Sequence, residues 1–240
     1  MTTFETQIFN CQKCKERLYY YDLSSYFITD SESYSDGYIN SNPPLPSFNQ
    51  IVICPNCQHV EWKDDIKTEE GYDTEDCIQC VDIGDIKRAF KTNQNLELAK
   101  YYLYLINTGF TNSPDREITI RIEIWRTLNN SIRYSATKNT QGRESRLIKV
   151  TSLLKHGENA QKLSKEEERI FIPNLEKLIT LFKPEYYEQE LLLAEMYREL
   201  RKFDNAMIVM ENISQSDRDS IYDQIWAAVR NRNEKVFKLN

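Results

Sequence analysis

Apolar and polar residues alternate differently in the two parts of this chain. Short β-prone runs predict strands at 6–10, 17–21, 50–53 and 60–62. From about residue 85 the apolar residues recur with a helical period. The pattern therefore predicts an α+β fold that is mostly α. The helices are expected at 96–106, from Pro114 past Ile132, and at 147–154, 166–182, 185–200, 204–213 and 219–229.

The helix that begins near Pro114 has the clearest start signal. Ser113 is a good N-cap, Pro114 suits the first helical position, and Asp115 places an acid in the first turn. An amphipathic stripe follows, and we expect it to face the core. Its members are Ile118, Ile122, Trp125, Leu128 and Ile132.

The segments 185–200 and 204–213 resemble one tetratricopeptide unit, which Pro184 opens. Small residues at its fixed offsets let two antiparallel helices approach, while large ones fill the gap to the next pair. No second repeat is visible at a 34-residue period, so a short irregular array is expected rather than a regular solenoid. The residues at these offsets are Leu193, Ala194, Tyr197, Phe203, Ala206 and Met210.

Two domains are predicted, 1–84 and 85–240. In the first, the polar stretch 22–50 has turn signals at 35–37 and 42–44, and 63–80 looks like an acidic connector. In the second, 136–145 is predicted to be a loop.

Charge is distributed unevenly between these two parts. Residues 1–84 hold 15 acids against five bases, a net charge of −10, whereas 85–240 carries +4. An acidic module repels phosphates, so the first part is not expected to bind nucleic acid. No signal peptide or membrane-length apolar run is visible, which makes the cytoplasm the expected location and membrane association unexpected.

Three CxxC pairs dominate the chemistry: Cys11/Cys14, Cys54/Cys57 and Cys77/Cys80. One CxxC turn can aim two sulfurs at a metal ion, and two such turns complete a four-cysteine zinc site. Spacing suits the second and third pairs, which are 19 residues apart. Flanking residues favour the first and second, because both have β-prone runs on each side, as a zinc-ribbon hairpin requires. We therefore predict Cys11, Cys14, Cys54 and Cys57 as ligands of a structural Zn²⁺.

Several motifs along the chain form a recognisable set: the first two CxxC pairs, 34–37, Trp62 with Asp64 and Asp65, 121–126 with Asn129, Asn130 and Arg133, 194–206, and the ending with Val236 and Phe237. Together they resemble an uncharacterised bacterial family of zinc-ribbon proteins with a C-terminal tetratricopeptide-like region. Glycine commonly follows the knuckle in that family, where this chain has Lys15 and Gln58, and the Cys77/Cys80 pair is a further departure. The resemblance covers most of the chain and implies no established activity.

The leftover pair Cys77/Cys80 has several readings. It is a surface thiol pair at the head of a helix, a second metal site with His59 or another chain, an alternative pair of zinc ligands, or a redox motif. His59 itself is expected on an exposed strand or behind the zinc ligands. His156 is expected to end a helix, and Trp62 to pack over the knuckle.

Residues 126–155 form a basic stretch of seven cations with Glu144 as the single acid. We interpret it as a solvated face that could dock the acidic part or bind phosphate. No phosphate loop, Ser/His/Asp set or HExxH motif is present. The expected function is therefore a non-enzymatic module that binds a protein or peptide. The alternatives are a nucleic-acid-associated factor using 126–155 and a thiol redox protein using Cys77/Cys80.

Overall fold

The computed structural model describes the chain except residues 1–2, 43–49, 70–73, 91 and 139–161. Contacts divide it into two compact units, one of residues 1–31 with 40–94 and the other of 32–39 with 95–240. This division differs from the expected one in two places. Residues 32–39 pack with the helical unit, and 85–94 stay with the strands.

The N-terminal unit is built on a long antiparallel hairpin of β1 (Thr3–Asn10) and β2 (Arg17–Ser25). A second antiparallel pair joins β5 (Ile51–Ile53) to β6 (Val60–Trp62), and a 3-10 turn, Lys63–Asp65, follows it. The four strands predicted in this region are therefore present, with β1 and β2 longer than expected.

The third CxxC pair is not outside the sheet, contrary to expectation. The short strand β7 (Ile78–Gln79) lies between its two cysteines and pairs in parallel with β2, Leu18 opposite Ile78. The backbone N–H of Cys80 donates to the Tyr19 carbonyl at 2.8 Å, and Val81 bridges to Ile53. Periodicity cannot reveal a two-residue strand whose partner lies 60 residues away. The unit ends in α1 (Ile83–Ala89), which Asp82 and Asp85 start with a capping box.

The polar stretch 22–50 contains a small hairpin of β3 (Asp30–Ser33) and β4 (Ile39–Asn42). Its turn includes Gly37, which has a positive φ of 72°. A Cβ atom there would lie 2.9 Å from an Arg126 nitrogen and 3.1 Å from a Leu192 methyl group. Glycine thus allows both the left-handed backbone and the close approach of α3 (Pro114–Lys138) and α5 (Tyr187–Glu199). Two backbone hydrogen bonds, from Ser35 N–H to the Phe237 carbonyl and from Leu239 N–H to the Ser33 carbonyl, tie this segment to the C-terminal residues 237–239.

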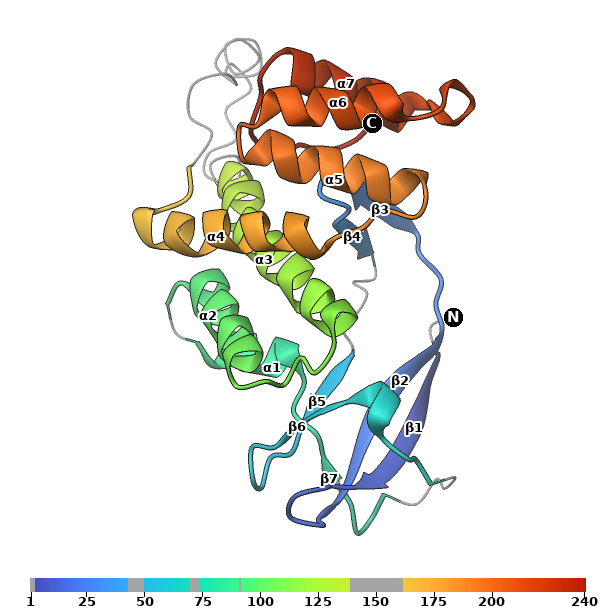
Figure 1. Cartoon of the computed structure of the whole chain (residues 1–240). Coiled ribbons are helices and arrows are strands. Elements are labelled where there is room, and N and C mark those ends of the chain that lie inside the picture. Colours follow the sequence, from blue (N-terminus) through green and yellow to red (C-terminus); the bar gives the residue numbers. More distant parts are fainter. Residues whose placement is uncertain (1–2, 43–49, 70–73, 91, 139–161) are drawn as a thin grey trace, which may run out of the picture. The chain divides into compact units, whose positions relative to one another are not determined.

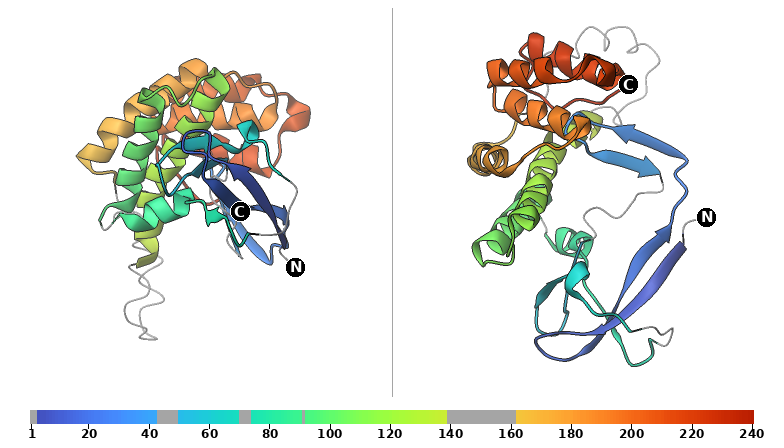
Figure 2. Two further views of the ribbon diagram at one scale, coloured as in Figure 1. Left: turned by 90° about the horizontal axis from the view of Figure 1, so that it is seen from below. Right: turned by 45° about the vertical axis from the view of Figure 1, so that its right-hand side comes forward.

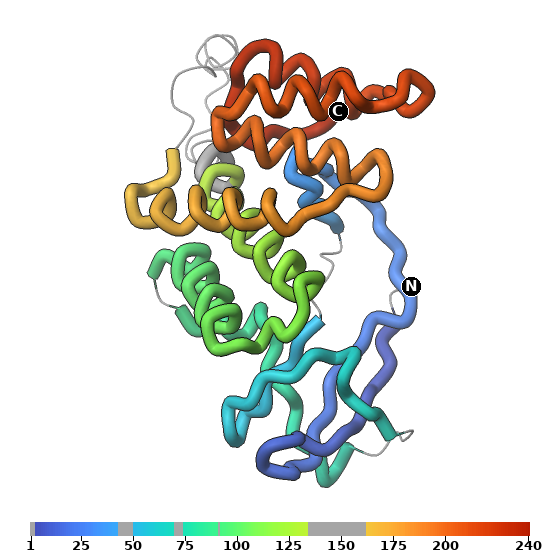
Figure 3. The backbone as a smooth tube through the Cα atoms, viewed as in Figure 1, coloured from blue at the N-terminus to red at the C-terminus, as the bar shows by residue number. Residues whose placement is uncertain are grey.

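The described residues of the second unit form six α-helices, and Figure 1 shows α5, α6 and α7 stacked beside one another. Within the unit α4 packs on α3, α5 on α6, and α7 on both α5 and α6. Figure 2 shows the same arrangement from two further directions, and Figure 3 draws the backbone as a tube in the view of Figure 1. The helices are α2 (Gln94–Asn107), α3 (Pro114–Lys138), α4 (Lys165–Leu181), α5 (Tyr187–Glu199), α6 (Phe203–Asn212) and α7 (Ser220–Arg230).

Nearby residues cap several helix ends, and the predicted N-cap Ser113 is one of them. The Arg116 N–H donates to the Ser113 hydroxyl at 3.3 Å, and Gly109 follows α2 with a φ of 77°. Ser164 and Glu167 form a capping box at α4, and the Asp219 carboxylate accepts from two backbone N–H groups of α7. These local bonds satisfy groups that every helix end leaves open.

The stripe predicted for α3 is incomplete. Trp125 and Leu128 are fully buried, but so are Ile120 and Ile124, which lie outside the stripe, whereas Ile118 is only half-buried. The helix is covered on more than one face, and a single-stripe prediction assumes one covered face.

The α5–α6–α7 core contains the small residues expected between closely packed helices. Ala194 and Ala206 are fully buried, as is Met210, and Tyr197 packs against the same cluster. The cluster is completed by residues of α7. Its remaining buried members are Leu191, Ile213, Tyr222, Ile225 and Val229.

Three expectations fall on residues outside the described part: the helix 147–154, the position of His156 and most of the loop 136–145. In the described part, α3 continues to Lys138. No helix among the described residues is long and apolar enough to cross a membrane.

Candidate metal centre

Two turns of the same form carry the first two CxxC pairs. In the first, the Cys11 N–H donates to the Glu16 carbonyl and the Lys15 N–H donates to the Cys11 carbonyl, both at 2.9 Å. In the second, the Cys54 N–H donates to the His59 carbonyl at 2.9 Å, and the Gln58 N–H donates to the Cys54 carbonyl at 3.0 Å. Each turn lies at the end of an antiparallel hairpin, β1–β2 or β5–β6.

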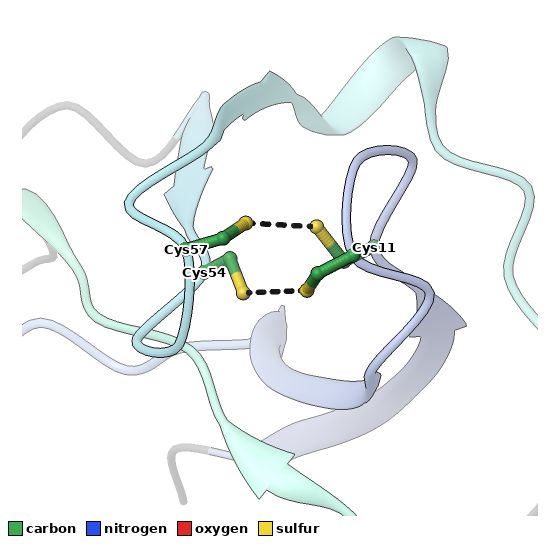
Figure 4. A group of neighbouring side chains, drawn as sticks. Cys11, Cys54 and Cys57 are labelled. Carbon is green, nitrogen blue, oxygen red and sulfur yellow. Dashed lines mark hydrogen bonds between the residues drawn. The ribbon is translucent and has the colours of Figure 1, made fainter.

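The four predicted ligands lie together in the structure. The Sγ atoms of Cys11, Cys14, Cys54 and Cys57 all lie within 4.8 Å of one another. The sulfurs of Cys11 and Cys57 lie 3.6 Å apart, and so do those of Cys14 and Cys54. Figure 4 labels Cys11, Cys54 and Cys57 in this group. All four are free thiols.

These separations suit a tetrahedral ion. Four sulfurs at the usual Zn–S length of about 2.3 Å lie about 3.8 Å from one another. The two measured pairs are within a few tenths of an ångström of that edge. A disulfide would require sulfurs about 2.05 Å apart. The arrangement therefore fits a metal ion such as zinc and does not fit a disulfide.

The acid–base properties of the thiols also favour a cation at this place. A hydrogen bond from the Glu16 backbone N–H lowers the pKa of Cys14 to about 7. Burial raises the pKa of Cys11 to about 12 and also raises that of Cys54. Without a cation, successive thiolates would repel one another inside the protein. A divalent ion removes that penalty and releases the protons when it binds.

Glu61 is a residue of this region that sequence reasoning missed. It is buried, and its Oε1 accepts from the Gln12 N–H at 2.9 Å, which ties the first turn to β6. Its Oε2 has no hydrogen-bond partner among the described residues. His59 lies 3.9 Å from the same carboxylate and is partly exposed, in keeping with a supporting position. Trp62 is buried, 4% exposed.

Cys77 and Cys80 are not part of the four-sulfur cluster. Cys80 is buried in the same apolar cluster as Cys11 and Cys54, and burial raises its pKa to about 12. A thiol with so high a pKa is a poor nucleophile, because the thiolate is the reactive form. The pair is therefore only partly at the surface, and Cys80 packs against the centre without joining it.

Lys15 and Gln58 have φ values of 62° and 60°, at the positions where glycine was expected after each knuckle. The left-handed region costs a residue with a Cβ about 1–2 kcal/mol, while glycine costs about 0.4–1 kcal/mol in unfolded-chain entropy. Lys15→Gly and Gln58→Gly are each expected to stabilise the zinc-loaded protein by about 0.5–1 kcal/mol in urea unfolding.

Lys13→Gly is the matched control for this prediction, since Lys13 is exposed in the same turn and is not among the positive-φ residues. It is expected to leave stability unchanged or lower it. Equal effects from all three variants would show that the positive φ values carry no strain.

Two arginines of the basic stretch 126–155 contact Asp36 within the helical unit. Arg133 is buried against Asp36, and Arg126 donates from Nε to the Asp36 carbonyl at 3.3 Å. Of its other bases, Arg143, Arg146, Lys149 and Lys155 lie outside the described part.

Searches with the whole chain found no matching protein-family model, no matching curated protein and no matching solved structure. The supported description is therefore an N-terminal β region with a four-cysteine cluster, followed by a helical region.

Proposed function

We propose that the protein is a non-enzymatic interaction module in which a structural zinc ion holds the N-terminal unit together and the helical unit binds a protein or peptide partner. The four sulfurs within 4.8 Å of one another carry this proposal. Zinc with four thiolates has no open coordination position, which is typical of a structural rather than a catalytic site.

The small size of the strand-bearing unit supports a structural role for the ion. One apolar cluster of this unit contains Cys11 and Cys54 together with Phe9, Leu18, Tyr20, Val52 and Cys80, and Cys14 and Cys57 pack against it. Small modules with so limited a core often depend on a metal for stability. In this proposal the ion replaces the core that the short strands lack.

The interaction role is supported by the helical array. The buried alanines of α5 and α6 let these helices pack closely, as in tetratricopeptide-like units, whose stacked helices present surfaces to peptides. Tyr186 and Ile208 expose more than half of their surface on this part of the array. The resemblance to zinc-ribbon proteins with a tetratricopeptide-like region agrees with both parts of the proposal.

The proposal is tested by metal analysis followed by partner capture. Protein prepared anaerobically from its native host is expected to contain one zinc per chain by mass spectrometry. Captured partners should persist after nuclease treatment and bind the purified full-length chain directly. Protein without zinc would contradict the structural-metal role. Partners that disappear with nuclease would favour the nucleic-acid alternative instead.

A further inference from the structure

The helical unit contains a cavity of about 360 Å³ that the metal-centre proposal does not use. It lies among α3, α4, the end of α5 and residues 234–236. This volume falls within the range of small-molecule sites, which combine apolar walls with a few polar groups. Asn129 and Glu199 are the deeply buried polar residues in its lining. The apolar lining residues are Ile132, Leu163, Phe171, Ile172, Leu200 and Val236.

Behind these two polar residues lies a buried cluster of charges. Arg133 pairs with Asp36, and Arg198 pairs with Glu195 and lies 3.9 Å from the Glu199 carboxylate. All five side chains are at most 2% exposed. Three carboxylates thus face two guanidinium groups, which leaves one negative charge uncompensated when all are ionised.

Hydrogen bonding at the cavity wall is also incomplete. The Asn129 Nδ2 group donates to Asp36 at 2.9 Å and to Glu199 at 3.2 Å, and Trp125 Nε1 donates to Glu199 at 2.8 Å. The Asn129 Oδ1 atom is buried and has no hydrogen-bond partner in the described part of the chain. A buried acceptor without a donor is costly and uncommon in a folded protein.

We propose that this cavity binds a small organic cation, a primary amine with an aliphatic or aromatic body, whose ammonium group lies beside Glu199 and Asn129. The ammonium supplies the missing positive charge and a hydrogen for the unpaired acceptor, while the apolar walls cover the body of the ligand. A carboxylate ligand would add a second uncompensated charge and is disfavoured. The inference goes beyond the proposed function and requires neither the metal nor a protein partner.

Two of the cations around the mouth are paired with acids that also line it. Arg201 pairs with Glu234 and Lys202 with Glu176, each at 3.1 Å. Both pairs are at the surface, with side chains at least a third exposed. The other charged lining residues are Lys162, Glu168 and Lys235.

Amine binding is expected to depend on pH through Glu199. Burial raises the pKa of this carboxyl group to about 8, Arg198 opposes the shift, and Asp36 and Glu195 add to it. The other charged groups on the packed elements are Arg133, Glu123 and Arg126 of α3, and the last two pair with each other. Because the ionised carboxylate binds the ammonium, affinity should rise roughly 20-fold between pH 6.5 and pH 8.5.

The test uses the full-length chain with 2-phenylethylamine, 2-phenylethanol and 3-phenylpropionate, which share an apolar body and differ in charge. Isothermal titration calorimetry at pH 6.5 and pH 8.5 is combined with tryptophan emission, since Trp125 contacts Glu199. Glu199→Gln keeps the shape and removes the charge. Glu188→Gln is the control, because Glu188 is an exposed acid of the same helix and does not line the cavity.

The expected result is binding of the amine alone, tighter at high pH, retained in Glu188→Gln and weakened at least about tenfold in Glu199→Gln. The alcohol or the carboxylate binding as tightly as the amine would overturn the proposal. Unchanged amine affinity in a folded Glu199→Gln variant would also overturn it. Should that variant fail to fold, the ligand series and the pH dependence in the wild type decide the question, and a flat pH profile refutes it.

Discussion

Cys54→Ser is expected to remove the metal from the protein and to unfold the N-terminal unit while the helical unit stays folded. Structural zinc contributes an apparent binding free energy of about 10–16 kcal/mol in small zinc modules. Loss of one thiolate removes one of four bonds and leaves the other three sulfurs without their ion. Zinc content by mass spectrometry should fall from one per chain to none, and limited proteolysis should cut within 3–90 first.

Cys77→Ser is the matched control for this experiment, because Cys77 belongs to a CxxC pair but not to the four-sulfur cluster. It is expected to retain one zinc and the wild-type digestion pattern. Loss of zinc from Cys77→Ser as well as from Cys54→Ser would instead support the alternative pairing based on spacing, in which Cys54, Cys57, Cys77 and Cys80 are the ligands. Treatment of the wild type with a strong chelator should reproduce the Cys54→Ser pattern.

Asp36→Asn is expected to destabilise the helical unit by about 3–5 kcal/mol, the usual cost of breaking a buried ion pair by removing one partner. Asp36 is fully buried, pairs with Arg133 and accepts from Asn129 at 2.9 Å. The variant leaves the Arg133 guanidinium buried without its counter-charge. Urea unfolding followed by circular dichroism at 222 nm measures the change in unfolding free energy.

Asp30→Asn serves as the control for Asp36→Asn, since Asp30 is an exposed acid of the same hairpin. Its effect is expected to stay within about 0.5 kcal/mol. A double variant, Asp36→Leu with Arg133→Met, should recover much of the lost stability, because it removes both charges together. If Asp36→Asn is no more destabilising than Asp30→Asn, the ion pair does not hold this hairpin to α3.

Much of the four-cysteine cluster was predictable because its parts are local. Each CxxC turn is defined by a few consecutive residues, and the strands beside it are short alternating runs that period-2 patterning reveals. The flanking strands correctly favoured grouping Cys11 and Cys14 with Cys54 and Cys57 over the pairing that spacing allowed. Glu61 could not be foreseen, since a buried acid in a strand has no sequence pattern of its own.

In the helical unit, local sequence patterns predicted helix ends better than they predicted which residues are buried or paired. Helix ends followed their capping residues, but the burial of Ile120 and Ile124 depended on elements that cover α3 from another side. The turn at 35–37 was predicted only as a turn. Its Asp36 contacts residues more than 90 positions later.

The sequence by itself determined the α+β class, the helices with their caps and the two knuckles, because all of these depend on residues a few positions apart. Only the tertiary structure decided that residues 32–39 belong to the helical unit and that Asp36, Arg133, Glu195, Arg198 and Glu199 form one buried cluster beside a cavity. The physical reason is the sequence separation of the residues that interact. Backbone hydrogen bonds and hydrophobic periods repeat along the chain, whereas a buried ion pair joins positions whose separation follows no period.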